Sequence, residues 1–159
     1  MTIFSRQKNL WITGILFTGI FVLIQVLPVK QVKIIPSTIA IPSPEKIIRP
    51  LVVNCKDCHS LNPTLPWYAR INPVSFYINN EIEEAREQFI FENWDKYSKL
   101  KQLRILEKSL REIKNNEMPP FFYSLVNSEK QLTEGEVQAL SDYIDFLSKQ
   151  TEQHRGWIP

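Results

Sequence analysis

The sequence predicts an all-helical fold, and three observations support that class. Glycine occurs only four times in 159 residues, and the Asn-Gly pairs that favour tight hairpin turns are absent. Apolar residues recur at intervals of three and four along two segments, as they do on the buried face of a helix. Thr133 and Glu136 match the Thr-x-x-Glu capping box that begins many helices. Together these features favour helices over strands.

The composition is that of one domain with an appendage. Apolar residues make up 43% of the chain, which is enough for a core. The formal net charge is +2, and Arg6 and Lys8 precede the first acidic residue. Without these two, 17 of the 19 basic residues remain, equal to the 17 acidic residues. We therefore expect no nucleic-acid partner, because such proteins carry a basic excess.

An uncharged, mostly apolar run covers residues 9–29. As a helix, this run would span about 30 Å, the hydrocarbon thickness of a bilayer. It predicts a single-pass transmembrane anchor, with residues 1–8 in the cytoplasm. A cleaved signal peptide is the alternative, although no small-x-small cleavage site directly follows the run. Either segment would engage the export machinery.

A proline-rich linker over residues 30–43 follows, and proline-rich linkers act as semi-rigid spacers. The first helix of the exported domain is expected to begin at Ser43 and Pro44, as N-cap and first helical residue, and to reach Cys55. Pro50 predicts a kink or an early stop in it. The prolines in and around the linker are Pro28, Pro36, Pro42, Pro44 and Pro50.

Three further helices are predicted, over residues 75–94, over residues 98–113, and from the capping box onward. Their apolar spacing indicates which side chains face the core. These are Phe76, Ile82, Ala85, Phe89 and Trp94; then Leu103, Leu106, Leu110 and Ile113; then Val137, Leu140, Ile144 and Leu147.

Both cysteines and one of the two histidines fall within five positions, at Cys55, Cys58 and His59. Cys-x-x-Cys-His is the signature of c-type haem attachment. Two intervening residues on one helical turn set the sulfurs about a porphyrin edge apart, and the adjacent imidazole then lies under the iron. We predict one covalent haem c per chain, with Cys55 and Cys58 as thioether sites and His59 as an iron ligand.

Three other interpretations of the motif remain open. A structural zinc site needs four ligands, and adjacent Cys58 and His59 cannot easily both reach one tetrahedral ion. A disulfide between Cys55 and Cys58 suits an exported chain. A thioredoxin-like redox pair would be expected in a βαβ setting, which this sequence does not show.

The sixth position of the iron is predicted to belong to Met118. Apart from Met1, it is the one methionine in the chain, and Pro119 and Pro120 follow it. Prolines cannot continue a helix, so Met118 is expected in a stiff loop just after one. His/Met ligation is typical of electron-transfer haems. His154, in a polar C-terminal stretch, is the competing ligand, and a core role is the alternative for Met118.

The motifs "CKDCHSLNPTLPWYARINPVSFYINNEIEEAR", "FENW" and "EMPPFFYSLVNSEKQLTEGE" resemble the bacterial haem-binding domain family related to class I cytochromes c. The resemblance extends over residues 44–148. It implies a cytochrome c-like helical domain around one haem, with Cys55, Cys58 and His59 attaching it and Met118 as distal ligand. The chain departs from the family pattern at Ala85, at residues 89–92 and at Asn127.

Trp67, Tyr68 and Arg70 are candidate partners of the haem propionates, because they follow His59 closely and supply N–H and O–H donors. A buried anion must be paired. The alternative is that the aromatic side chains belong to the core and that Arg70 is solvated.

The function predicted from these features is a membrane-anchored, single-electron carrier on the periplasmic side of a bacterial inner membrane. It is not expected to be an enzyme, since His59 and Met118 would saturate the iron. Its expected partners are the bilayer, redox proteins and the haem attachment machinery. The alternatives are a haem-based sensor or peroxidase-like enzyme with a labile sixth ligand, and a thiol–disulfide exchanger. The expected segments are 1–8, 9–29, 30–43, a haem domain over 44–150, and a tail over 151–159.

Overall fold

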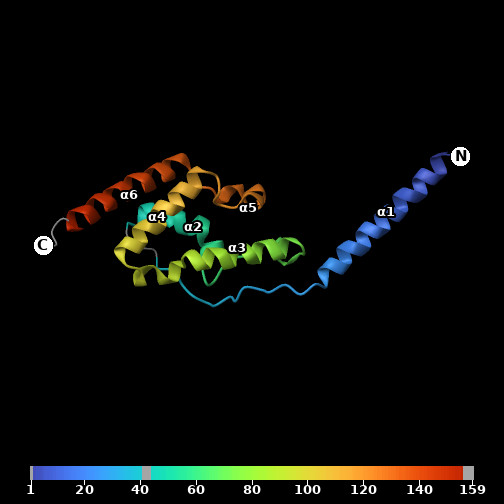
Figure 1. The fold of residues 1–159 in the computed structure, drawn as a ribbon, viewed down its shortest axis with the longest axis horizontal. Coiled ribbons are helices and arrows are strands. Elements are labelled where there is room, and N and C mark those ends of the chain that lie inside the picture. The colour runs from blue at the N-terminus through green and yellow to red at the C-terminus, as the bar shows by residue number, and fades with distance from the viewer. Residues whose placement is uncertain (1, 41–43, 156–159) are drawn as a thin grey trace. The chain divides into compact units, whose positions relative to one another are not determined.

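All regular structure in the described residues is helical (Figure 1). The computed structural model describes residues 2–40 and 44–155, and these contain no strand. The predicted all-helical class is therefore confirmed. The α-helices are α1 (Thr2–Gln25), α2 (Glu45–His59), α3 (Val74–Gln88), α4 (Lys99–Lys114), α5 (Phe121–Val126) and α6 (Glu134–Arg155), and the short 3-10 helices are η1 (Trp67–Arg70), η2 (Phe91–Lys96) and η3 (Ser128–Lys130).

The chain divides into two compact units, each built from separate segments. One unit joins the chain up to Val32 with Leu65–Glu81, and the other joins Lys33–Thr64 with the chain from Ile82 onward. The second unit holds both cysteines, His59 and Met118, so it contains most of the predicted site.

In the first unit, the end of α1 is bound to Asn72. The Gln25 side chain donates to the Asn72 carbonyl at 2.8 Å and accepts from the Asn72 amide at 3.1 Å. The Asn72 side chain in turn donates to the Ile24 carbonyl at 2.8 Å. The helix ends at Gln25 and not at Val29, because Pro28 disfavours helical geometry in the residues before it.

None of the helices in the described part of the chain is long and apolar enough to cross a membrane. The prediction of a transmembrane helix over residues 9–29 is therefore not supported by the fold. Much of α1 nevertheless presents apolar side chains to solvent: Leu10, Trp11, Ile12, Ile15, Leu16, Phe17, Ile20, Phe21, Val22 and Leu23.

The core of the second unit forms where α6 packs against both α2 and α4 (Figure 1). The expected inward faces of α4 and α6 are confirmed, since Leu103, Leu106, Leu140 and Ile144 are buried. Leu110, Ile113 and Leu147, also expected on these faces, are partly buried and pack against the core. The buried cluster comprises Ile48, Leu51, Val52, Phe89, Phe91, Trp94, Leu103, Ile105, Leu106, Leu140 and Ile144.

The caps of these helices follow the sequence signals. Ser98 accepts from the Lys101 amide at 3.3 Å at the start of α4. Thr133 and Glu136 form both bonds of the predicted capping box, at 2.8 and 3.3 Å. At the other end, α6 continues to Arg155, so it takes in part of the expected tail.

Pro50 does not stop α2, which continues to His59. The predicted early stop is therefore wrong. A proline inside a helix costs about 3 kcal/mol, but its neighbours Leu51 and Val52 are both buried. Burial of each such side chain contributes about 1.5–3 kcal/mol, which offsets that cost. The expected N-cap, Ser43, lies outside the described residues, and Pro44, expected as the first helical residue, is instead the N-cap, so that α2 begins at Glu45.

The expected helix over residues 75–94 is interrupted. It ends at Gln88, and Ile90 is extended, with φ −130° and ψ 129°, before η2 begins. The extended geometry turns both Phe89 and Phe91 into the core, whereas a continuous helix would separate them by about 200°. Phe76, expected inside, is exposed.

Replacing Leu140 by alanine should lower the free energy of unfolding by about 2–5 kcal/mol, because the side chain is 0% exposed at the centre of the core. Urea denaturation measures the change. Leu125→Ala is the matched control, since Leu125 is 64% exposed and its loss should change the free energy by less than about 0.5 kcal/mol. Equal losses in the two variants would contradict the packing described here.

Candidate functional site

The last turn of α2 carries the two cysteines and His59. Cys55 and Cys58 are three residues apart and so lie on the same face of the helix. Both are half-buried, and neither forms a disulfide. The disulfide considered from the sequence is therefore not formed in this structure.

His59 is held in the core by Phe89. The two rings stack with their centroids 4.0 Å apart, and Phe91 meets the imidazole edge-on at 6.4 Å. His59 Nδ1 lies 3.3 Å from the Phe89 carbonyl oxygen. Because a carbonyl only accepts, Nδ1 carries the proton, and Nε2 keeps its lone pair for another partner. Metal-binding histidines are commonly oriented in this way.

The imidazole is neutral at physiological pH. Burial lowers the pKa of His59 to about 4 and outweighs the carbonyls of Phe89 and Ala85, which raise it. A neutral imidazole is the form that coordinates metals. The site therefore presents a ligand that needs no deprotonation.

At the same pH, the side chain of Cys55 is a protonated thiol. Burial, followed by the charges of Cys58 and Asp57, raises the pKa of Cys55 to about 12. Thiol exchange requires a thiolate, and exchange proteins lower this pKa. The raised pKa of Cys55 is opposite in direction to the shift that favours thiol exchange.

The chain just after His59 is bound to Glu92. One oxygen of this carboxylate, Oε1, accepts from the Ser60 hydroxyl at 2.7 Å, the Leu61 amide at 3.0 Å and the Ser37 hydroxyl at 2.7 Å. Burial raises the pKa of Glu92, but the bonds from Ser60 and Ser37 outweigh burial and lower it. The other oxygen, Oε2, is buried without a hydrogen-bond partner among the described residues.

Arg86 reinforces the same point of the fold. Its guanidinium donates twice to the Ser60 carbonyl, at 3.0 and 2.7 Å, and once to the Lys33 carbonyl at 2.8 Å. The Ile35 amide also donates to the Leu61 carbonyl at 2.8 Å. Part of the expected linker is therefore bound to the segment that follows His59. Sequence reasoning missed both Arg86 and Glu92, although a lone acid among buried aromatic residues was a usable signal.

Met118 lies in the turn between α4 and α5, as expected for a residue just after a helix. Asn116 adopts the left-handed conformation, with φ 57°, and ends α4. The Glu117 and Met118 amides both donate hydrogen bonds to the Glu112 carbonyl, at 2.8 and 3.3 Å. The side chain is half-buried. Its role as sixth ligand stays a prediction.

A buried carboxylate links α2 to the segment beyond Met118. Asp57, between the two cysteines, accepts from the Tyr123 hydroxyl at 2.8 Å, and Lys130 lies 3.4 Å from the same oxygen. This contact joins residues 66 positions apart in the chain. Sequence reasoning did not identify it, because nothing local marks either partner.

The predicted propionate partners lie on η1, in the first unit. Trp67 is 77% exposed, so the alternative that it belongs to the core is wrong. Tyr68 meets it edge-on at 5.8 Å, and Arg70 is exposed. Pairing with a propionate stays a prediction for all three. His154 belongs to α6, but its side chain lies outside the described part of the structure.

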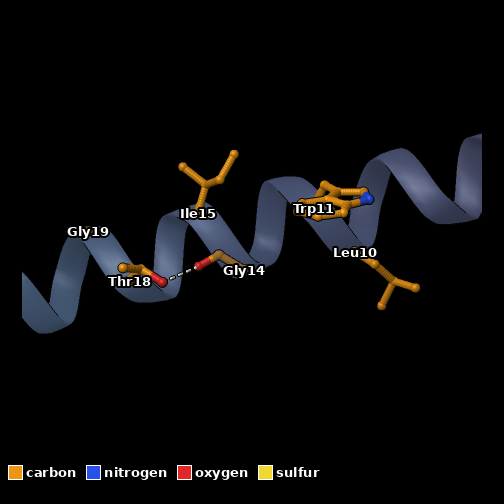
Figure 2. A pocket seen from close by; sticks show the side chains of 6 residues that line it. All are labelled: Leu10, Trp11, Gly14, Ile15, Thr18 and Gly19. Atoms are coloured by element: carbon orange, nitrogen blue, oxygen red, sulfur yellow. Dashed lines mark hydrogen bonds between the residues drawn. The ribbon is translucent and has the colours of Figure 1, made fainter.

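Neither a metal cluster nor the hollow on α1 provides a second functional site in the described residues. Within the described residues, no three His, Cys, Asp or Glu side chains gather as a metal site, so the zinc interpretation has no support. A hollow on α1 is lined by one helix alone (Figure 2). Its polar side chain, Thr18, donates to the Gly14 carbonyl at 2.9 Å.

Glu92→Gln should weaken the protein at neutral pH and much less in acid. A carboxylate with a lowered pKa contributes stability above its unfolded pKa of about 4.5 and loses it as the pH falls through the folded value. Urea unfolding at pH 7 and at successively lower pH values below the unfolded pKa measures this difference. Glu87→Gln, at an exposed position of α3, is the control. A Glu92 effect that is the same at all of these pH values would contradict the prediction.

The comparison with known families gives one match over most of the chain. Residues 19–145 match the model of a family described as a haem-binding domain. The match begins within α1, earlier than residue 44, where the resemblance was expected to start. No curated protein and no solved structure matches the chain. Because the matched segment covers more than half of the chain and contains Cys55, Cys58, His59 and Met118, the protein belongs to the haem-binding domain family.

Proposed function

We propose that the protein is a c-type cytochrome that holds one covalent haem and carries single electrons. The observation that supports this most directly is the state of His59. Its Nδ1 is bonded to the Phe89 carbonyl and its pKa is lowered to about 4, so Nε2 is a neutral donor on the same helix end as two cysteines that form no disulfide.

The donor set at the end of α2 fits a haem. Each thiol, at Cys55 and Cys58, would add its S–H bond across one vinyl group, forming a C–S bond and placing the hydrogen on the other vinyl carbon. That addition needs no oxidant. The haem supplies an iron that cycles between two oxidation states, and the protein supplies the ligands and the apolar surroundings.

A sixth ligand from Met118 makes electron transfer the favoured activity. A thioether is a neutral, soft donor that raises the reduction potential relative to a second imidazole. It would also occupy the face on which oxygen or peroxide binds. A haem-based sensor or peroxidase-like enzyme would instead need that face open or labile.

The location and partners of this carrier are part of the proposal. The apolar run at residues 9–29 would direct the chain to the export machinery, and the haem domain would work on the periplasmic side. Attachment of the haem there would require the cell's haem attachment machinery. The electron donor and acceptor would be other redox proteins.

Covalent attachment is tested on the full chain, produced together with haem attachment machinery. Denaturing electrophoresis with a haem stain should give a stained band at 18.7 kDa. The double variant with Cys55→Ala and Cys58→Ala should lose the stain, because no thioether can form. Extraction of the haem from the intact protein by acidified organic solvent would disprove the thioether assignment.

Met118→Ala should leave the sixth coordination position of the iron open. We expect loss of the sulfur-to-iron absorption band, a lower reduction potential, and rapid binding of imidazole or carbon monoxide. The helical content should persist, because the core of α2, α4 and α6 does not include Met118. Leu125→Ala serves as the control, and an unaltered spectrum in Met118→Ala would favour the sensor or enzyme alternative.

A further inference from the structure

We propose that Asp57 is a positioning residue, which holds the Met118 segment against the haem-attachment helix through Tyr123 and Lys130. This inference rests on the proposed function, in which Met118 is the sixth ligand of the iron. The carboxylate is 3% exposed. Its Oδ2 atom accepts from the Tyr123 hydroxyl at 2.8 Å and lies 3.4 Å from Lys130 Nζ.

The energetics of Asp57 point to a role beyond stabilising α2. An acid near the C-terminus of a helix is opposed by the helix dipole. A buried carboxylate is destabilising unless it is paired, and Oδ1 of Asp57 is buried with no hydrogen-bond partner in the described part of the chain. Both effects disfavour Asp57 at this position, and its pairing with Tyr123 and Lys130 offsets them.

The Tyr123 hydroxyl is coupled to Met118 by a short, stiff connection. Pro119 and Pro120 separate Met118 from α5, which carries Tyr123. The Ser124 hydroxyl donates to the Pro119 carbonyl at 3.1 Å, and the Ser124 amide donates to the Pro120 carbonyl at 3.0 Å. The two prolines are therefore bonded to the helix that follows them, and this connects the Met118 turn to the helix that carries Tyr123.

The other side of the contact is the ligand helix itself. Asp57 lies two residues before His59 on the last turn of α2. The Asp57–Tyr123 bond therefore links the proposed proximal ligand to the segment of the proposed distal ligand. On its other side, the Met118 segment is bonded to the end of α4, where the Met118 amide donates to the Glu112 carbonyl.

The test is the affinity of the ferric, haem-loaded full chain for added imidazole, which must displace Met118 from the iron. Tyr123→Phe removes one hydroxyl and keeps the ring. We expect about a tenfold gain in imidazole affinity, since a hydrogen bond to a charged group is worth at least that factor. Tyr143→Phe, which removes a hydroxyl from α6 and keeps the Asp57–Tyr123 pair, should leave the affinity unchanged.

A double variant separates positioning from a general loosening of the fold. In the Met118→Ala background, Tyr123→Phe should give no further gain, because the ligand that it positions is gone. An equal gain in both backgrounds, or no gain with Met118 present, overturns the role of Asp57. If Met118→Ala alone does not change imidazole binding, the proposed iron ligation fails, and this inference falls with it.

Lys130→Met provides an independent variant should Tyr123→Phe not fold. The Lys130 side chain is 23% exposed, so its replacement leaves the buried hydrogen bond between Tyr123 and Asp57 in place. We expect a smaller gain in imidazole affinity than with Tyr123→Phe, again absent in the Met118→Ala background. A Lys130→Met protein that binds imidazole as the unaltered chain does would remove Lys130 from the proposal. If Tyr123→Phe does not fold, the same result would overturn the proposal as a whole.

Discussion

The hydrogen bond between His59 Nδ1 and the Phe89 carbonyl is the contact around which the second unit is arranged. It selects one tautomer of the imidazole and leaves Nε2 as the donor atom. It also requires that the chain leave helical geometry after Gln88, so that the Phe89 carbonyl is free of a helical partner and can accept. The same break turns Phe89 and Phe91 toward the imidazole, where they contribute to the burial that lowers its pKa.

Two carboxylates fix the chain near this histidine. Glu92 binds the residues that follow His59, through the Ser60 hydroxyl and the Leu61 amide. Asp57 precedes His59 and binds Tyr123, on the segment that follows Met118. Each carboxylate is satisfied at one oxygen and has a second oxygen buried without a partner in the described residues. Polar contacts of this kind specify one arrangement of segments, because a displaced partner would leave a buried charge unpaired.

The apolar core supplies the rigidity that these polar contacts need. α6 packs on α2 and α4, and Leu140 lies at the centre of the cluster. This packing keeps α2 helical past Pro50, so that the cysteines and His59 lie on one continuous turn. A flexible end of α2 could not hold two thiols and an imidazole in a constant relation. The chemistry proposed for the site therefore depends on helices that do not take part in it.

Local signals in the sequence determined the helical class, the caps at Ser98 and Thr133, the apolar faces of α4 and α6, and the motif at Cys55, Cys58 and His59. These depend on residues within one or two turns of each other, which is the range over which periodicity and capping act. The break after Gln88 and the roles of Glu92 and Asp57 were decided by tertiary structure. The bond between Leu61 and Glu92 joins residues 31 positions apart, and the bond between Tyr123 and Asp57 joins residues 66 positions apart. No local pattern encodes a buried carboxylate's partner, because burial and pairing exist only once distant segments have packed together.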